Sequence, residues 1–472
     1  MVVSLAQAQE VCQQIEDAIT SASAMSYFGA RSYFDDIFHW ASSSTELAQC
    51  SVQPGTAEDV GIILGIIGKT RTPFAVKGGG HTTNVNFSST TGVQIAMTRF
   101  SEVTYDAQSQ TAVIGSGLIW DDVYEALAPY NVNVVGGRVS GVGVAGFTLG
   151  GGYSYLSNQY GLTIDNVVAF ELVTPDGSVA NVTETSDPEL FFSLKGGLNN
   201  YGIVTRFTMR TYPQGQVWGG LAMYVNDSVN KVTEAIGSFV ANVTDPKAMI
   251  VPTYNFGLGS ESTSVLMLMF YDDPTPPEGM FEEILSIPYA SFDVRSRDFL
   301  SLVSMVPSAI ASGTRKSFNA VPILKLTPNL LRAVFNETEA WGRALTKETS
   351  RLTIGYDVVQ YHADTLSHAS SPSAYPPTRD AVYSPLTLYY DWTHKSQDET
   401  FHNAIRESVR RLESVAVAEG QVGVESASVY PNNAIFDTPV ERIYGENLGR
   451  MRATKSRVDP ENVMGLAGGF KI

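Results

Sequence analysis

The sequence predicts an α+β fold in two domains. Its 472 residues exceed the size at which a single hydrophobic core keeps growing. Over residues 52–205, helical, strand-like and glycine-rich segments follow one another without the regular alternation of a doubly wound sheet. Over residues 216–425 the glycine motifs stop, and long alternating strand-like runs are interleaved with helical ones. The change in pattern favours a separate second domain there.

The chain begins with a helical segment, residues 1–45, for which we expect one or two helices. The apolar residues of its first run recur at helical spacing, namely Ala6, Val11, Ile15 and Ile19. A further helix is expected within residues 52–72, with Thr56 as its N-cap and its end near Gly68. A short apolar strand then leads into the first glycine loop.

That loop, Val76–Asn84, sets Gly78, Gly79 and Gly80 directly before His81. Residues without side chains let the backbone turn tightly and present successive N–H groups to an anion, so the loop is a candidate phosphate cradle beside a nucleophilic imidazole. A glycine-rich surface turn with a solvated histidine explains these residues equally well.

A second glycine run, Gly141–Gly146, matches the dinucleotide fingerprint G-x-G-x-x-G. The Rossmann interpretation needs a regular helix afterwards, yet Gly150, Gly151 and Gly152 follow shortly, and glycines disfavour helix. We therefore expect a second glycine-lined surface facing the same ligand as the first loop. Its apolar residues indicate that the segment is packed rather than a flexible loop.

Net charge is −17, from 31 basic and 48 acidic residues. Nucleic-acid binding requires a clustered positive surface, so the net charge argues against this class, and it disfavours binding to an anionic membrane for the same reason. No apolar run is long enough to span a bilayer.

Two cysteines, Cys12 and Cys50, are too few for a metal site, so we expect a disulfide and no metal, with two buried free thiols as the alternative. Asn-X-Ser/Thr sequons occur at Asn86, Asn181, Asn226, Asn242 and Asn336. Sequons and paired cysteines together favour a secreted protein or the secretory pathway. No signal segment precedes Val2, which leaves its removal or an intracellular location as the two explanations.

Further along, Tyr160–Val179 predicts a hairpin with a Pro-Asp-Gly turn, and Pro188–Thr205 a short helix, a turn and a strand. Near the C-terminus stand Tyr430-Pro-Asn432, Tyr444–Met451 and Val458–Val463. In order and spacing, these motifs and the two glycine segments resemble the berberine-bridge-enzyme-like branch of the FAD-linked oxidases, the vanillyl-alcohol-oxidase type. The resemblance covers residues 30–215 and 425–465 well and the middle poorly.

The resemblance implies a PCMH-type FAD-binding domain from residues 1–215 plus 426–472, and a substrate-binding domain from residues 216–425. The second would be an antiparallel sheet that covers the reactive face of the flavin and is backed by helices. We expect strands at residues 217–225, 264–271, 352–362 and 385–392, and helices at residues 229–240, 278–285, 329–346 and 397–419.

The same resemblance implies FAD bound covalently through His81. Some relatives carry a second, cysteinyl link, whose position here would be Val139 or at most Ser140, so a single covalent attachment is predicted. The other residues expected to contact FAD are Lys77, Gly78, Gly79, Gly80, Thr82, Asn84, Ser116, Gly117, Val139, Gly143, Gly146, Thr148, Gly150, Gly151, Tyr153, Gly202, Ile203, Val204 and Asn432.

Oxidation at a flavin requires a base that removes a proton from the substrate heteroatom. Tyr430 is the first candidate, with a phenol whose pKa nearby positive groups could lower. Alternation on the 352–362 strand places Tyr356, Val358, Gln360 and His362 on one face and Asp357, Val359 and Tyr361 on the other. If the first face is inward, Gln360 and His362 face the cavity, although a structural histidine is an equal alternative. Some relatives place an acidic residue on this strand, but Gln360 and His362 would then stand near that place instead.

Two function classes follow. The first is an oxidase that dehydrogenates an alcohol or amine carbon of a small organic substrate and passes the electrons to molecular oxygen, giving hydrogen peroxide. The second is a non-redox isomerase or cyclase of secondary metabolism in which FAD is structural. The sequence determines neither the substrate nor the oligomeric state.

Overall fold

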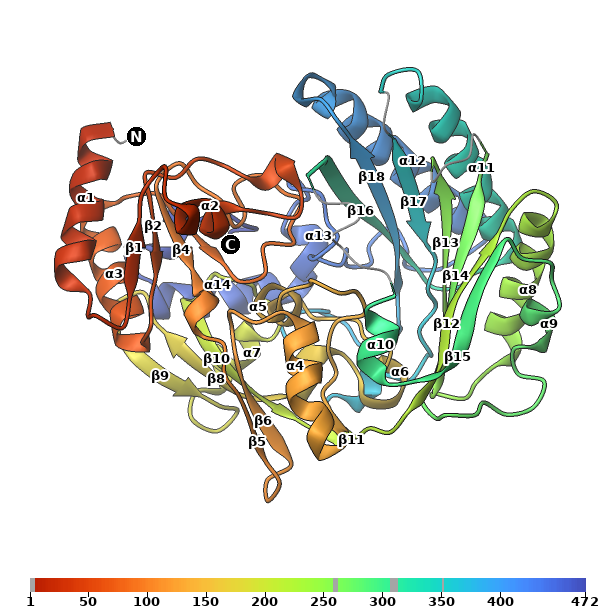
Figure 1. Cartoon of the computed structure of the whole chain (residues 1–472), viewed down its shortest axis with the longest axis horizontal. Coiled ribbons are helices and arrows are strands. Elements are labelled where there is room, and N and C mark those ends of the chain that lie inside the picture. Colours follow the sequence, from red (N-terminus) through yellow and green to blue (C-terminus); the bar gives the residue numbers. More distant parts are fainter. Residues whose placement is uncertain (1–4, 258–261, 306–312, 350–351) are drawn as a thin grey trace.

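The computed structural model describes residues 5–257, 262–305, 313–349 and 352–472. Two groups of elements stand side by side, and the C-terminal segment returns from the second group to the first (Figure 1). Within the described residues no helix is both long and apolar enough to cross a bilayer. The first four residues of the predicted N-terminal helical segment lie outside the described residues.

The first sheet has the strand order β1-β2-β4-β3, in which β2 and β3 run parallel to β4 and β1 is antiparallel to β2. Its strands are β1 (Ala24–Ser26), β2 (Cys50–Gln53), β3 (Phe74–Lys77) and β4 (Val93–Ala96), and its helices are α1 (Leu5–Ala18), α2 (Arg31–Ile37) and α3 (Ala57–Thr70). Thr56 caps α3 as predicted, because its side chain accepts from the Asp59 N–H. The helix continues past Gly68 to Thr70 and ends where Arg71 adopts a φ of +53°.

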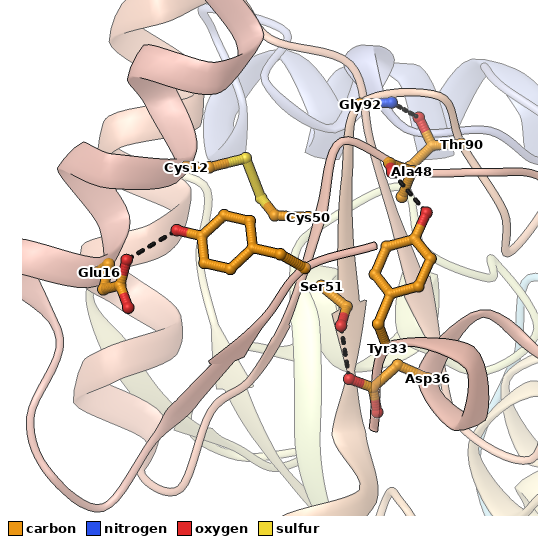
Figure 2. The surroundings of a disulfide bond; sticks show 10 residues. Cys12, Glu16, Tyr33, Asp36, Ala48, Cys50, Ser51, Thr90 and Gly92 are labelled. Carbon is orange, nitrogen blue, oxygen red and sulfur yellow. Dashed lines mark hydrogen bonds between the residues drawn. A yellow bond between two sulfur atoms is a disulfide. The ribbon is translucent and has the colours of Figure 1, made fainter. Parts of the chain in front are cut away.

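A disulfide between Cys12 on α1 and Cys50 at the start of β2 ties the N-terminal helix to this sheet (Figure 2). Both cysteines are buried in the apolar cluster formed by α1, α3 and the sheet. Close by, Ser51 donates to Asp36 at 2.6 Å and the Tyr33 hydroxyl donates to the Ala48 carbonyl at 2.6 Å, which holds α2 against β2. The predicted disulfide is confirmed, and the free-thiol alternative is wrong.

The second sheet is antiparallel, with the order β5-β6-β10-β8-β9. Its strands are β5 (Val103–Asp106), β6 (Thr111–Gly115), β8 (Val167–Val173), β9 (Val179–Val182) and β10 (Ile203–Arg210), and around it lie α4 (Trp120–Leu127), α5 (Val144–Leu149), α6 (Ser157–Tyr160) and α7 (Pro188–Leu194). The hairpin β8–β9 is the one that the Pro-Asp-Gly turn predicts. Two short strands, β7 (Val132–Asn133) and β11 (Tyr212–Pro213), pair antiparallel. The Gly141–Gly146 fingerprint therefore follows an antiparallel strand, and the Rossmann interpretation fails.

The third sheet has seven strands in the order β15-β12-β14-β13-β17-β18-β16, with every pair antiparallel. The strands are β12 (Val217–Tyr224), β13 (Ala248–Phe256), β14 (Ser264–Tyr271), β15 (Ser291–Arg297), β16 (Arg315–Ile323), β17 (Thr353–Asp357) and β18 (Ser384–Trp392). Helices cover one face (Figure 1), namely α8 (Ser228–Asn242), α9 (Glu282–Leu285), α11 (Pro328–Leu345) and α12 (Asp398–Ala418). A short helix, α10 (Phe299–Val303), packs against α4 of the first group.

The C-terminal segment, with α13 (Glu441–Tyr444) and α14 (Leu448–Val458), packs on the first group of elements. Lys455 donates to the Asn200 carbonyl at 3.1 Å, and the Asn200 side chain donates to the Phe470 carbonyl at 2.9 Å. Ala467 pairs with Phe74 of β3. The α+β, two-domain fold is thus confirmed, whereas the domain boundaries at residues 215 and 425 stay a prediction.

The disulfide should contribute to stability by restricting the unfolded chain, because it closes a separation of 38 residues. We expect the double variant Cys12→Ala, Cys50→Ala to lose about 2–4 kcal/mol of unfolding free energy. The midpoint of urea unfolding measures the loss. Two reactive thiols in the unreduced, unfolded protein would contradict the pairing.

Candidate functional site

A cavity of about 1130 Å³ lies between the glycine loops and the face of the seven-stranded sheet that the helices leave free. The loop after β3, the segment leading into α5, residues 198–204 and residues 430–433 form one wall. Alternate residues of the sheet strands form the other. Small-molecule pockets usually measure about 300–1,000 Å³, so this volume suits a large cofactor together with a substrate.

The two glycine loops touch each other at the floor of the cavity. A Cβ on Gly79 would lie 2.5 Å from the Gly143 Cα, and one on Gly143 would lie 2.5 Å from the Gly79 N. Gly78 lies close to Ser116 in the same way, because a Cβ on Gly78 would lie 3.0 Å from the Ser116 carbonyl oxygen. Glycine is required here because any side chain would separate the loops, and the result is a cavity floor made of main chain.

His81 follows this floor and lines the cavity. Its ring stacks on Trp40 with the centroids 4.2 Å apart and the planes 12° from parallel. The Nε2 atom is buried and has no hydrogen-bond partner among the described residues. Burial lowers the pKa of His81 to about 4, and the charge of Lys316 lowers it further. The imidazole is therefore neutral and nucleophilic at neutral pH.

Most of the residues predicted to contact FAD line this cavity. They are Gly78, Gly79, Gly80, His81, Thr82, Asn84, Ser116, Val139, Gly143, Gly146, Tyr153, Gly202, Ile203, Val204 and Asn432. Trp40, Phe87, Val142, Ala145, Phe147 and Leu198 also line it, although no sequence motif singled them out as cofactor contacts.

Five predicted contacts do not line the cavity: Lys77, Gly117, Thr148, Gly150 and Gly151. Lys77 is buried and donates to the carbonyls of Asp35 and Phe38 at 2.8 and 2.9 Å, so it joins α2 to β3. Gly117 and Gly150 allow close packing. A Cβ on Gly117 would lie 2.0 Å from the Met97 carbonyl oxygen, and a Cβ on Gly150 would lie 2.0 Å from the Asn432 Oδ1 atom. Their glycine character thus serves packing behind the cavity wall.

Tyr430 lines the cavity together with Asn432, whose side-chain N–H donates to the Tyr430 hydroxyl at 2.9 Å and to the Phe147 carbonyl at 3.0 Å. The ring of Tyr153 packs edge-on against the ring of Tyr430, with the ring centroids 4.9 Å apart. Burial raises the pKa of Tyr430 to about 12, and the opposing effects of Asn432 and Arg138 are smaller. The expected lowering of this pKa is therefore wrong.

Gln360 and His362 lie away from the cavity and line a separate small pocket beside α8. The Gln360 side-chain oxygen accepts from the Leu326 N–H at 2.7 Å, and the His362 backbone N–H donates to Asn158 at 3.0 Å. The expectation that these two residues face the cavity is wrong for a simple reason. Strand β17 ends at Asp357, and its inward face carries the odd-numbered residues.

The inward face of β17 instead brings Asp357 to the cavity, where Thr253 of β13 donates to it at 2.6 Å. Burial raises the pKa of Asp357 above its ordinary value, although Thr253 and Arg138 oppose the shift. Arg138, on the segment before α5, lines the same region. The sequence contained an acid at this place on the strand, but alternation could not tell which face was inward.

The rest of the sheet wall has an apolar part, Leu221, Val251, Phe256, Leu266 and Leu268, and a polar part, Asn255, Thr353, Thr387, Tyr389 and Asp391. Met305, which follows α10, also lines the cavity. Among the cavity-lining residues in the described part of the chain, Arg138 is the one that carries a basic side chain of the Lys or Arg type. The glycine floor therefore offers an anion backbone groups rather than cations.

A main-chain cradle, an imidazole with an unpartnered Nε2 atom and a wall formed by the sheet meet in one cavity, which suits a large bound cofactor. The comparisons with known proteins indicate an FAD-dependent oxidoreductase. Residues 48–183 match the family described as the FAD binding domain. An uncharacterised FAD-linked oxidoreductase of Arthroderma benhamiae is 38% identical over 60% of this chain, and the match spans 57% of that protein. The FAD-dependent monooxygenase drtC of Aspergillus calidoustus is 28% identical over 98% of this chain and 90% of its own length.

Two solved structures share the fold. The wild-type BBE-like 1 protein of Physcomitrella patens has a TM-score of 0.77 at 20% identity, covering 98% of this chain and 97% of that one. Glucooligosaccharide oxidase of Acremonium strictum, described with a 6-S-cysteinyl, 8α-N1-histidyl FAD, has a TM-score of 0.77 at 16% identity and covers 98% of each chain. The chain thus contains an FAD-binding domain over residues 48–183, is related to FAD-dependent oxidoreductases, and shares the fold of the BBE-like and glucooligosaccharide oxidase structures.

The loop contact predicts the effect of adding one methyl group. Gly79→Ala should force the loops apart, at a cost of about 1–3 kcal/mol, and lower the FAD content of the purified protein. Gly65→Ala on α3 is the matched control, since nothing lies within 4 Å of a Cβ at that position. The ratio of flavin to protein absorbance measures occupancy. Full FAD loading in Gly79→Ala would show that the loop contact does not shape the cofactor site.

Proposed function

We propose that this protein is an FAD-dependent oxidase that dehydrogenates an alcohol or amine carbon of a small organic substrate and uses molecular oxygen as electron acceptor, releasing hydrogen peroxide. The observation that carries the proposal is the position of His81. A neutral imidazole with a buried, unpartnered nitrogen lies in a cavity whose opposite wall holds Asp357. When bound, FAD accepts a hydride from the substrate carbon and returns the electrons to oxygen.

The chain's own residues would hold the cofactor through main chain. Gly78, Gly79 and Gly80 form the floor with Gly143, and the backbone of residues 202–204 extends it. We propose a single covalent bond from His81. The chain has two cysteines, and both are in the disulfide, so no thiol remains for a cysteinyl link; Val139 stands in the cavity where that link is expected.

For proton removal, the candidates are Tyr430 and Asp357, because Asp391, the other carboxylate that lines the cavity, is paired with Lys316 at 3.2 Å and accepts from Thr314 at 2.7 Å. A phenol with a pKa of about 12 is a poor acceptor at neutral pH, whereas a carboxyl whose pKa is raised from 3.8 is suited to the task. We therefore assign proton acceptance to Asp357. Tyr430 would orient the substrate oxygen through its hydroxyl, which Asn432 holds in place. No catalytic role is assigned to Gln360 or His362.

The apolar part of the sheet wall supports an apolar substrate body over a carbohydrate. Leu221, Val251, Leu266 and Leu268 offer hydrophobic contact and no hydrogen bonds to hydroxyl groups. The sharpest alternative reaction is oxygen insertion, since the drtC relative is described as a monooxygenase. A non-redox isomerase or cyclase remains the other outcome to test.

The setting proposed for the protein is secretory. The disulfide favours an oxidising environment. All five sequon asparagines, Asn86, Asn181, Asn226, Asn242 and Asn336, are exposed and thus accessible for glycosylation.

The covalent bond is tested by acid precipitation. The flavin should remain with the precipitated protein, and the tryptic peptide containing His81 should carry the added mass of FAD. His81→Ala should release its flavin into the supernatant, while His394→Ala, at an exposed histidine, should retain it. A yellow supernatant from the unsubstituted protein would refute the covalent bond.

The reaction is tested by mixing the holoenzyme anaerobically with apolar alcohols, amines and hydroxy acids. An active substrate should bleach the visible flavin band, and air should restore it with one peroxide per substrate. Asp357→Asn and Tyr430→Phe should each slow bleaching about 100-fold, whereas Tyr254→Phe on the opposite sheet face should stay within about twofold. Because the pKa of Asp357 is raised and the base must be ionised, the rate should fall as pH falls through that pKa.

Three results would contradict the oxidase. Product formed without bleaching indicates the isomerase or cyclase, and labelled dioxygen appearing in the product indicates a monooxygenase. An unchanged acidic limb of the pH profile in Asp357→Asn removes this residue as the base.

A further inference from the structure

Arg138 has no role in the chemistry described so far, yet its side chain lines the cavity. Among the described residues its guanidinium makes no hydrogen bond or ion pair, and its Nη1 atom is buried without a partner. Buried guanidinium groups are ordinarily paired, because an unpaired charge costs several kcal/mol. The arrangement therefore calls for an anion that is not part of the chain.

The groups around Arg138 do not provide that anion. The Tyr155 hydroxyl donates to the Arg138 carbonyl at 3.1 Å, so this phenol serves the main chain. Asp357 accepts from Thr253 and forms no ion pair with Arg138. Although burial disfavours its charge, the oxygens of Tyr361, Tyr155 and Asp357 raise the pKa of Arg138, and the guanidinium stays charged.

The position of Arg138 places the missing anion beside the reacting groups. Tyr430 and Asp357 both lie close enough to Arg138 to raise the pKa of its guanidinium. The apolar wall of Leu221, Val251 and Leu268 lies in the same cavity. A guanidinium matches the two oxygens of a carboxylate in a planar, bidentate arrangement.

We propose that Arg138 binds a carboxylate of the substrate, so that the substrate is an organic acid with an apolar body and its carboxylate beside the carbon that is oxidised. This rests on the proposed function, since it takes the cavity to be the substrate site. Carbohydrates and neutral alcohols are then poor substrates. The acidic chain accepts an anion here because the local field of Arg138 outweighs the net charge of −17, which is spread over the surface and screened.

Benzoate and benzamide test the proposal, because they share shape and differ in charge. Both are titrated into the oxidised holoenzyme, with binding followed by calorimetry and by the shift of the visible flavin band. Benzoate should bind at least about tenfold more tightly than benzamide. Arg138→Gln should lose that preference, and Arg138→Lys should keep part of it. Arg295→Gln is the matched control for charge, at a side chain that is 67% exposed, and it should behave as the parent.

Equal affinity for benzoate and benzamide in the parent protein would overturn the proposal without any variant. So would an Arg138→Gln protein that retains its flavin and its preference for benzoate. A lowered flavin redox potential in Arg138→Gln with benzoate binding unchanged would assign the guanidinium to the reduced cofactor instead. Failure of the proposed function is distinguishable, because it appears as protein without flavin or without bleaching, whereas calorimetry reads benzoate binding independently of both.

Discussion

The contact between the two glycine loops is the constraint on which the site depends. Gly79 and Gly143 approach so closely that neither has room for a Cβ, and this contact fixes the loop that carries His81 against the segment that carries Arg138. The imidazole and the guanidinium therefore line one cavity although 56 positions of chain separate them in the sequence. The disulfide between Cys12 and Cys50 joins α1 to β2, and Lys77 joins β3 to α2, so the sheet from which the first glycine loop emerges is itself held to its helices. Rigid main chain, rather than charged side chains, shapes this wall of the cavity.

The seven-stranded sheet supplies the other wall. Because of its pleat, alternate residues of each strand face either the covering helices or the cavity. On β13, β17 and β18 one set of residues packs under the helices, with Tyr254, Tyr356 and Tyr390 buried there. The alternate set, including Thr253, Asp357 and Thr387, faces the cavity. Because Thr253 and Asp357 are cross-strand partners, the hydrogen bond that orients the carboxyl is built into the register of the sheet.

The sequence predicted well wherever a local residue type imposes a local geometry. Thr56 caps its helix, Pro175-Asp176-Gly177 turns the β8–β9 hairpin, and the glycines before His81 form the floor of the cavity. Prediction was weaker in the second domain. Strands β13, β15 and β16 were missed. Two of them contain a proline, Pro252 in β13 and Pro322 in β16, which normally argues against a sheet interior. The end of β17 was misplaced by five residues, because Val358–His362 keeps an alternating pattern after the pairing with β18 has stopped.

By itself the sequence predicted the α+β class, the glycine loop with its histidine and the pairing of its two cysteines, because glycine, histidine and cysteine act through properties of the residue and its nearest neighbours. Only the tertiary structure decided which face of β17 looks inward, and so replaced Gln360 and His362 by Asp357 in the cavity. It also decided that Arg138 stands without a partner. Alternation defines two faces of a strand but does not say which one is covered by helices, and burial without a partner depends on residues distant in the chain.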